Sequence, residues 1–444
     1  MEWYYSLVLM LGTVFVLMAL SLPVAFAFFV TNIVGALIFL GGGAGIETFI
    51  RGSMFSISTF SLAPIPFFLV IGEILLRTGL AFRAVNAIDQ VIRRVPGRLS
   101  VVAVTGGTFF SALSGSTVAT TAMLGQALVP DMLRRGYHPT MAMGPIIAVG
   151  GVDMLIPPSN LAVIFATIAS SVSIVKISIA ELLVAGILPG LIMSALFITY
   201  IIVRCWWSPH LAPPALKEAD MLHGWARWKP LLVSVAPLMS IFFVMIGSIF
   251  MGWASPTDSA ALGCLATVVL AGCYRVLTVS AVIGALKNSA IVTTMIFFIV
   301  AASTTFAQIL AISGATDGAL GQLVKFNLTP LGAVLCMVGV LIFLGCFMEQ
   351  IAMMLLTLPF FIPLANSLHV DMLWLSIVLL ISLQIGLIHP PFGLLLFVMR
   401  GVAPPEITVR QIWISIIPFV IMVFAVLFLI IFVPWIATSV ARLM

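Results

Sequence analysis

Long, continuous runs of apolar residues dominate the chain. Four of the clearest extend over residues 5–30, 101–130, 231–253 and 412–436. A helix needs about 20 apolar residues to cross a bilayer, so each run is long enough for a membrane span. A membrane β-barrel would instead show short segments of alternating polarity. Because lipid offers no partner to free backbone groups, the pattern predicts an all-α polytopic membrane protein in a lipid bilayer.

Composition and charge agree with this class. Hydrophobic residues make up 62% of the 444 residues and charged residues only 7%, whereas about 25% of an ordinary soluble domain is charged. The net charge of +5 comes from basic residues in short loops, where they set orientation in the membrane. We therefore expect no nucleic-acid partner. The five cysteines show no Cys-x-x-Cys spacing, so the sequence predicts neither a disulfide framework nor a cysteine metal site.

The chain divides near its middle. The longest polar stretch, with several prolines and charged side chains, lies within residues 206–229, and we interpret this segment as a linker. The sequence then predicts a first transmembrane repeat at 1–205 and a second at 230–444. Many secondary transporters are built from internal repeats of this kind.

One constant offset along the chain aligns the two halves without a gap. It places Pro130 on Pro363 and the pair Pro157-Pro158 on Pro390-Pro391, and we call it the proline offset. In repeat transporters the helix breaks of the two halves correspond, as these prolines do. We therefore interpret the chain as an internal duplication.

Each half contains an apolar span interrupted by Pro-Pro, at residues 152–160 and 385–393. Two prolines remove two backbone donors and clash with the preceding turn, so the helix cannot continue. Unwound carbonyls at that depth are potential ligands for a dehydrated cation. A simple kink is the alternative for one break, whereas two matching breaks favour a paired site. The candidates are Asp153, Pro157, Pro158, Ser159 and Asn160 in the first break, and His389, Pro390, Pro391 and Gly393 in the second.

Small and hydroxylated residues cluster at 111–117, near the centre of the apolar run 101–130. A run of this length can fold as a re-entrant hairpin whose tip presents hydroxyls and carbonyls. Such residues also mediate close packing of membrane helices, which is the alternative interpretation. The segment 344–350 occupies the matching position in the second half. The predicted tip of the first hairpin is Ser114, Gly115, Ser116 and Thr117.

Ionisable side chains inside apolar spans are costly and are functional candidates by default. Two have a structural explanation, because Glu73 lies near a basic loop and Asp258 occupies a position typical of a helix cap. Asp153, Glu349 and His389 lie within a few residues of the predicted breaks. There an acid can neutralise a cation or exchange a proton, and a histidine can contact an anion or titrate. A buried pair that only stabilises the fold is the alternative.

A series of motifs resembles the large, M-type subunits of tripartite ATP-independent periplasmic (TRAP) transporters over nearly the whole chain. Their order and spacing both match. The motifs lie at residues 66–73, 77–79, 112–119, 128–130, 136–137 and 155–159 in the first half, and at 345–350, 359–363 and 386–393 in the second.

The resemblance implies an elevator-type carrier of the bacterial inner membrane, in which a scaffold holds a mobile transport domain of two inverted repeats. Each repeat has a re-entrant hairpin and a broken helix. Sodium ions would couple uptake of a small organic anion, with a carboxylate the family-based expectation. A periplasmic substrate-binding protein and a small four-helix membrane subunit would be the partners. The family's cation sites correspond to Ser114, Gly115, Ser116, Pro157, Pro158, Ser159, Ser313, Gly314, Pro390 and Gly393, with sodium held through Ser114, Ser116, Ser313, Gly314 and the backbone near Pro157 and Pro390.

Three residues depart from the family pattern. His389 replaces a threonine that is usual before Pro-Pro, Glu349 replaces the usual aspartate, and Asp153 lies where small residues are common. Proton coupling, or a carrier independent of a binding protein, therefore stays open as an alternative.

Other classes of membrane protein fit less well. A channel would need rings of like residues around a pore, whereas broken helices in two unlike halves suit alternating access. The sequence lacks H-E-x-x-H, G-x-S-x-G and the G-x-x-x-x-G-K-[ST] motif of ATP-driven transport. We expect the chain to be no enzyme and to use no cofactor other than coupling ions.

Overall fold

The computed structural model describes residues 2–92, 95–173, 176–213, 225–325 and 329–443. Every regular element in these residues is an α-helix or a short 3-10 helix. Six of the helices are long and apolar enough to cross a membrane, or seven if a bent pair is counted as one span. The predicted all-α polytopic class is therefore confirmed.

The helices fall into two series. In the first series they are α1 (Trp3–Ala19), α2 (Val24–Phe39), α3 (Gly43–Ile57), α4 (Pro64–Arg77), α5 (Leu80–Val91), α6 (Arg98–Ser114), α7 (Thr117–Arg134), α8 (Pro139–Gly150), α9 (Asn160–Val172), α10 (Ile179–Ala185) and α11 (Ile187–Trp207). In the second they are α12 (Trp225–Ser234), α13 (Ala236–Phe250), α14 (Pro256–Cys273), α15 (Val279–Ile312), α16 (Ala315–Lys325), α17 (Pro330–Leu344), α18 (Gln350–Ser367), α19 (Met372–Ile388), α20 (Leu394–Val402), α21 (Val409–Phe432) and α22 (Trp435–Thr438).

The order of helix starts recurs along the chain. The helices α13, α18 and α19 begin at the positions that the proline offset assigns to the starts of α1, α7 and α8, respectively. The starts of α14, α16, α17 and α20 lie close to the positions assigned to those of α2, α5, α6 and α9. The 34-residue helix α15 takes the place of α3 and α4 together. The same offset that aligns the prolines thus also aligns the helices.

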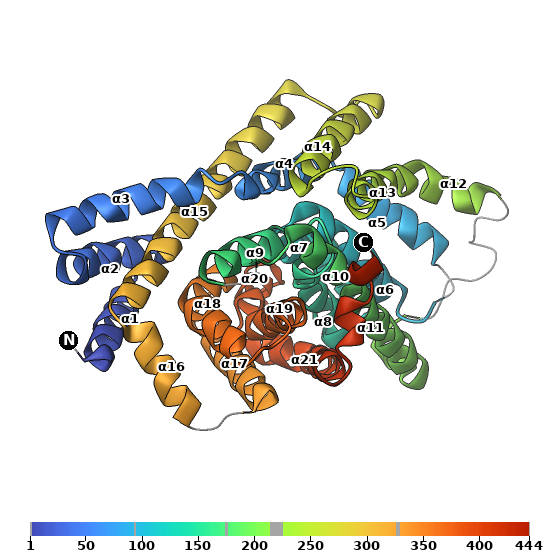
Figure 1. The fold of residues 1–444 in the computed structure, drawn as a ribbon. Coiled ribbons are helices and arrows are strands. Elements are labelled where there is room, and N and C mark those ends of the chain that lie inside the picture. Colours follow the sequence, from blue (N-terminus) through green and yellow to red (C-terminus); the bar gives the residue numbers. More distant parts are fainter. Residues whose placement is uncertain (1, 93–94, 174–175, 214–224, 326–328, 444) are drawn as a thin grey trace.

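Two layers of helices are visible in Figure 1. The long helix α15 packs against α2, α3 and α4, and α14 packs against α4 and α13, so that these helices form an outer arc. Inside the arc, α6, α7 and α8 pack together, α17 packs against α19, and α21 lies against both α8 and α19. We call these two parts the outer arc and the inner bundle.

The prediction of a single span is wrong for one apolar run, and a second run is bent. The run 5–30 is divided between α1 and α2, because Ser21 has a positive φ of 65° and Pro23 cannot continue a helix. The run 231–253 is divided between α12 and α13, which meet at an angle of 45°. Pro237 lies in the first turn of α13, where its missing N–H is not needed. The run 412–436 agrees with α21, which ends at Phe432.

The predicted linker 206–229 is partly helical. The helix α11 extends to Trp207, and α12 begins at Trp225. Residues 214–224 lie outside the described residues. The division into two repeats joined by this linker stays a prediction.

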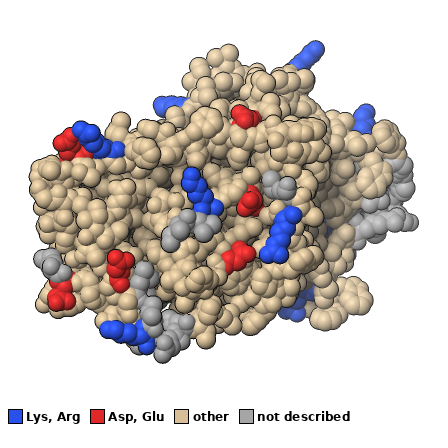
Figure 2. Space-filling view, in the orientation of Figure 1, with Lys and Arg blue, Asp and Glu red and all other residues tan. Residues whose placement is uncertain are grey.

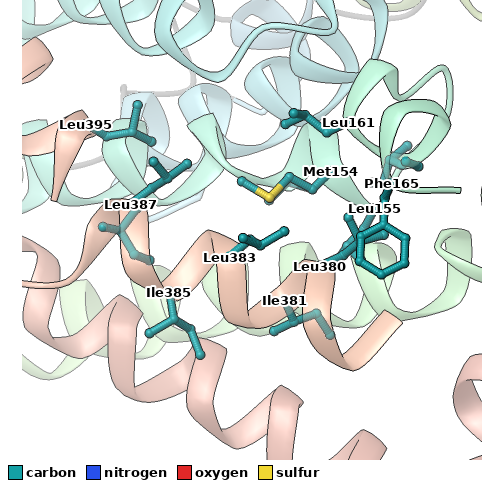
Figure 3. Packing of buried hydrophobic residues seen from close by; sticks show 14 of the residues in the cluster. Met154, Leu155, Leu161, Phe165, Leu380, Ile381, Leu383, Ile385, Leu387 and Leu395 are labelled. Atoms are coloured by element: carbon teal, nitrogen blue, oxygen red, sulfur yellow. The ribbon is translucent and has the colours of Figure 1, made fainter. Parts of the chain in front are cut away.

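An apolar seam joins the two halves of the inner bundle around both Pro-Pro breaks (Figure 3). Met154, Leu155 and Phe165 come from the first half, and all are at most 1% exposed. They lie across from Leu380, Leu383 and other side chains of α19. Each half therefore completes the core of the other.

The surface has the character expected of lipid contact. Figure 2 shows one face on which charged side chains are few and scattered among uncharged ones. Large apolar side chains such as Phe55 (77% exposed) and Trp253 (80% exposed) lie outside the core. Exposed aromatic and aliphatic groups are stable in a bilayer, where there is no water to avoid.

Candidate functional site

The first predicted hairpin tip is present. The helix α6 ends at Ser114 and α7 begins at Thr117. Gly115 between them has a φ of 58°, which glycine adopts at little cost. The Ser116 hydroxyl accepts a hydrogen bond from the Ala119 N–H at 3.3 Å and so caps α7. The side chain of Ser114 lies outside the described residues, and the re-entrant placement of the hairpin stays a prediction.

The first Pro-Pro break is also present. After α8 the chain forms a 3-10 turn, Val152–Met154, and α9 begins only at Asn160. The Ser159 hydroxyl donates to the Met154 carbonyl at 3.2 Å and accepts from the Ala162 N–H at 3.1 Å. This hydroxyl therefore fixes the unwound segment to the start of α9.

The tip and the break of the first half meet directly. The Asn160 side-chain amide donates to the Gly115 carbonyl at 3.3 Å. A Cβ atom at Gly115 would lie 2.4 Å from the same amide nitrogen, so only glycine permits this approach. The Ser111 hydroxyl, one turn before Gly115, donates to the carbonyl of Gly150, the last residue of α8, at 3.4 Å.

The second half repeats this arrangement with different residues. The helix α19 ends at Ile388, before Pro390 and Pro391, and α20 begins at Leu394. Its break packs against the segment that follows α17, since a Cβ atom at Gly345 would lie 2.3 Å from the Gly386 Cα atom. The Gly393 N–H donates to the His389 carbonyl at 3.0 Å. Gly345 and Gly386 thus bring the segment after α17 close to the break, through residues other than the equivalents of Gly115 and Asn160.

A cavity of about 390 Å³ separates part of the second tip from the second break. Glu349, which precedes α18, lines it together with Phe347 and Phe392. The two phenyl rings stack at 6.3 Å between centroids. The proline offset places Glu349 on Ser116, so the acid occupies the place of the capping hydroxyl in the first half.

Contacts between the halves bring all four segments together. The Gln350 amide donates to the Thr117 hydroxyl at 3.3 Å. A Cβ atom at Gly151 would lie 2.6 Å from the Gln384 Cγ atom. In both pairs the proline offset places one residue on the other. The helix α18 packs against α9, and α20 packs against α7.

Several buried oxygens near this meeting point make no hydrogen bond within the described structure. They belong to the Thr121 hydroxyl, the Asp153 carboxyl and the side-chain amides of Asn160 and Gln384. Buried polar groups are normally paired, so unpaired ones call for an explanation. Small hard cations take carboxylate, carbonyl and hydroxyl oxygens as ligands. The residues present therefore have the donor chemistry that sodium requires.

Not every predicted site residue belongs to this meeting point. Ser313 and Gly314 lie between α15 and α16, where the Ser313 hydroxyl donates to the Leu310 carbonyl of its own helix at 3.0 Å. Their role in sodium binding stays a prediction. Gln350 and Gln384 were missed by the sequence-based prediction, although each carries a signal, a polar amide within an apolar helix.

Two acids interpreted as structural have that role. Asp258 forms a capping box with Ser255 at the start of α14, in which each side chain bonds to the other residue's N–H. Glu73 pairs with Arg77 at 2.9 Å and accepts from the Asn288 amide at 2.5 Å.

Comparison with known proteins decides the family. The model of the DctM component of the tripartite ATP-independent periplasmic transporters matches residues 11–436. The chain belongs to this family. As a TRAP large permease it is a membrane transport protein and not an enzyme. Such permeases work with a second, smaller membrane subunit and a periplasmic binding protein.

Individual relatives extend over most of the TRAP permease. The C4-dicarboxylate TRAP transporter large permease of Pseudomonas aeruginosa is 30% identical over 84% of this chain and 84% of its own length. The isethionate TRAP transporter permease protein DctMQ of Oleidesulfovibrio alaskensis is 28% identical over 93% of this chain and 65% of its own length.

The fold itself has been seen in a solved structure. The YdaH transporter of Alcanivorax borkumensis superposes with a TM-score of 0.64 over 91% of this chain and 90% of its own, at 13% identity. At this identity the likeness shows the fold alone.

Proposed function

We propose that this TRAP permease takes up a small organic anion across the bacterial inner membrane. The first candidate for this anion is a carboxylate. A gradient of sodium ions drives uptake, and a periplasmic binding protein delivers the substrate. A small four-helix subunit accompanies the permease in the membrane. The meeting of two hairpin tips and two broken helices through the Thr117–Gln350 hydrogen bond is the observation that carries the proposal.

The contacts between the halves support two inverted repeats. Two residues that are equivalent in a duplication can touch each other only near an axis that exchanges the copies. Thr117 with Gln350 and Gly151 with Gln384 are two such pairs. The packing of α18 on α9 and of α7 on α20 is the reciprocal contact that a two-fold axis generates. Inverted repeats of this kind place substrate and ion sites at the repeat interface.

The layering of the fold supports an elevator mechanism. The inner bundle carries all four segments of the site, whereas the outer arc presents exposed apolar helices. We propose that the outer arc is the scaffold and that the inner bundle moves as the transport domain. Rigid-body movement of one bundle against the rest of the protein is a general form of alternating access, and here the site would move with the inner bundle.

The coupling ion is proposed from the donor chemistry. Buried oxygens without partners on Thr121, Asn160 and Gln384 suit sodium. A second candidate, proton coupling, is favoured by Asp153, whose carboxyl is 1% exposed and has one oxygen without a partner. An unpaired carboxylate is costly inside a membrane, and protonation removes that cost.

The substrate class is proposed from the relatives. One relative is a C4-dicarboxylate permease and another an isethionate permease. Both are carriers of small organic anions. Isethionate is a sulfonate, so the chemistry that the two share is a small organic anion, and we test carboxylates first.

Uptake into proteoliposomes tests the proposal. The chain is reconstituted with its small membrane subunit and the binding protein, and uptake of radiolabelled succinate and a panel of other carboxylates is measured. A sodium gradient is expected to drive uptake, and omission of the binding protein is expected to abolish it. Uptake driven by a proton gradient alone would show that protons, and not sodium ions, are coupled to transport. The absence of uptake of any carboxylate would refute the proposed substrate class.

A further inference from the structure

A second, larger cavity lies between the outer arc and the inner bundle. Its volume is about 740 Å³, nearly twice that of the cavity at Glu349. The C-terminal half of α9 and the segment before α10 form one wall, and parts of α3, α4, α14 and α15 form the opposite wall. Because α9 rises about 1.5 Å per residue, Ser170 lies roughly 15 Å from Asn160 and the hairpin tip. The cavity is therefore separate from the site described above.

The lining of this cavity combines a largely apolar surface with many hydroxyl groups and one sign of charge. Ten serine and threonine residues contribute to it, together with Gln308 and Lys176. Among the lining residues Lys176 is the single charged one. Clefts lined by one sign of charge raise the local concentration of the opposite ion.

Some polar side chains of the lining make no hydrogen bond to another described residue, and three of them, Ser61, Lys176 and Gln308, are exposed. Several of the hydroxyls already donate to backbone carbonyls, as Thr167 does to Val163 at 2.8 Å. In contrast, the hydroxyls of Ser61 and Thr257, the Gln308 amide and the Lys176 ammonium group show no hydrogen bond within the described residues. Thr257 is only 9% exposed and lies in the first turn of α14. The N-terminal end of a helix favours anions through its dipole and its free N–H groups.

The nearby acid does not cancel this preference. Asp258 follows Thr257, but its carboxylate is held by the Ser255 N–H at 3.2 Å and by the Ser255 hydroxyl at 2.6 Å. Asp258 is not among the lining residues. The cavity thus offers unpaired donors and one cation, which together fit a carboxylate bearing hydroxyl or further carboxyl groups.

We propose that this cavity is a docking site for the transported anion between the outer arc and the inner bundle, with Lys176 as its charged contact. The inference rests on the proposed function, because it takes the ligand of the cavity to be the transported organic anion. Lys176, Gln308, Ser61 and Thr257 supply the donors. The anion then has a binding place about one helix length from the ion site.

A test of charge selectivity does not depend on transport. The full complex carries Ser171→Cys as a reporter in the cavity, with the five native cysteines replaced. A negatively charged sulfonate methanethiosulfonate and its positively charged trimethylammonium counterpart are compared for their rates of reaction with Cys at this position.

The anionic reagent is expected to react faster, and Lys176→Gln is expected to lower the ratio of the anionic to the cationic rate by about fivefold. Lys176→Arg should preserve the ratio, and Lys287→Gln, which removes a charge from the exposed face of α15, should leave it unchanged. Equal rates for the two reagents, no effect of Lys176→Gln or an unreactive reporter would overturn the proposal.

The transport arm of the test uses succinate. Lys176→Gln is expected to raise the succinate concentration for half-maximal uptake by about fivefold or more, while Lys287→Gln leaves it unchanged. If no carboxylate is taken up at all, the proposed function is wrong. The ratio of the labelling rates of the anionic and cationic reagents still tests whether the cavity prefers anions. A lipid headgroup is distinguished by comparing vesicles of phosphatidylcholine with vesicles containing phosphatidylglycerol. Labelling blocked only by the anionic lipid, with uptake insensitive to Lys176→Gln, would assign the cavity to lipid and overturn the proposal.

Discussion

Thr117 and Gln350 are equivalent residues of the two halves, and their side chains bond to each other at 3.3 Å. Each begins the second helix of its hairpin, α7 in one half and α18 in the other. The hydrogen bond therefore connects the two tips directly.

The first prediction concerns this hydrogen bond. Thr117→Val and Gln350→Leu remove its acceptor and its donor, and a double-mutant cycle measures their coupling in the free energy of unfolding. We expect a coupling of about 0.6 kcal/mol, and at most ~1.7 kcal/mol, as found for side-chain hydrogen bonds between membrane helices. Thr294→Val is the control, because Thr294 bonds only to Ala290 of its own helix. The changes in unfolding free energy caused by Thr294→Val and Gln350→Leu should simply add in the double variant. If those of Thr117→Val and Gln350→Leu also simply add, the hydrogen bond between Thr117 and Gln350 is contradicted.

The second prediction concerns the closest backbone approach of the second half. Gly345→Ala would place a Cβ atom 2.3 Å from the Gly386 Cα atom, so the tip and the break must move apart. We expect at least about a tenfold loss of uptake, equivalent to ~1.4 kcal/mol, measured at equal amounts of protein in the membrane. Gly339→Ala on the same helix meets nothing within 4 Å and should behave as the unsubstituted chain. Equal uptake by the two variants would show that the approach is not needed.

The third prediction concerns the acid at the second tip. Glu349→Gln removes the negative charge that lines the 390 Å³ cavity. Two opposite unit charges near a protein surface attract by several kcal/mol at contact distance, so we expect the sodium concentration for half-maximal uptake to rise at least about tenfold. Glu349→Asp should retain most of the affinity. Glu47→Gln is the control, because this side chain is 65% exposed in a surface pair with Arg51. If the sodium dependence of uptake is the same in Glu349→Gln as in the unsubstituted chain, Glu349 does not belong to the sodium site.

The fourth prediction concerns stability rather than transport. Asp258→Ala removes the acid of the capping box at the start of α14. Loss of a cap costs about 0.5 to 2 kcal/mol, so the midpoint of thermal unfolding is expected to fall. The sodium dependence of uptake should not change. Asp258→Asn, which keeps an acceptor for the Ser255 N–H, should recover part of the loss.

The breaks and tips of the fold were predictable because their causes are local. Pro-Pro ends a helix wherever it occurs, and Gly115-Ser116 suits a tight turn with a helix cap, so neither depends on distant contacts. The run 5–30 was misjudged for a related reason. Pro23 was present in the sequence, but the length of the apolar run outweighed it in the interpretation.

The partners of each residue were not predictable in the same way. The proline offset shows that Thr117 and Gln350 are equivalent, yet it does not show which equivalent pairs lie at the axis between the halves. The chain contains many such pairs, and only tertiary packing brings this one into contact. The hydroxyl-lined cavity is a further case, since it combines residues from six separate helices and turns.

The exchanged packing of the halves bears on how such a chain arose. Because α18 lies on α9 and α7 lies on α20, a single half would leave Met154 and Phe165 uncovered. With the inverted repeats proposed above, a gene for one half alone would encode a subunit that completes its core with an oppositely oriented copy of itself. We therefore expect the ancestor to have been a dual-topology dimer, whose two orientations became permanent when the genes fused.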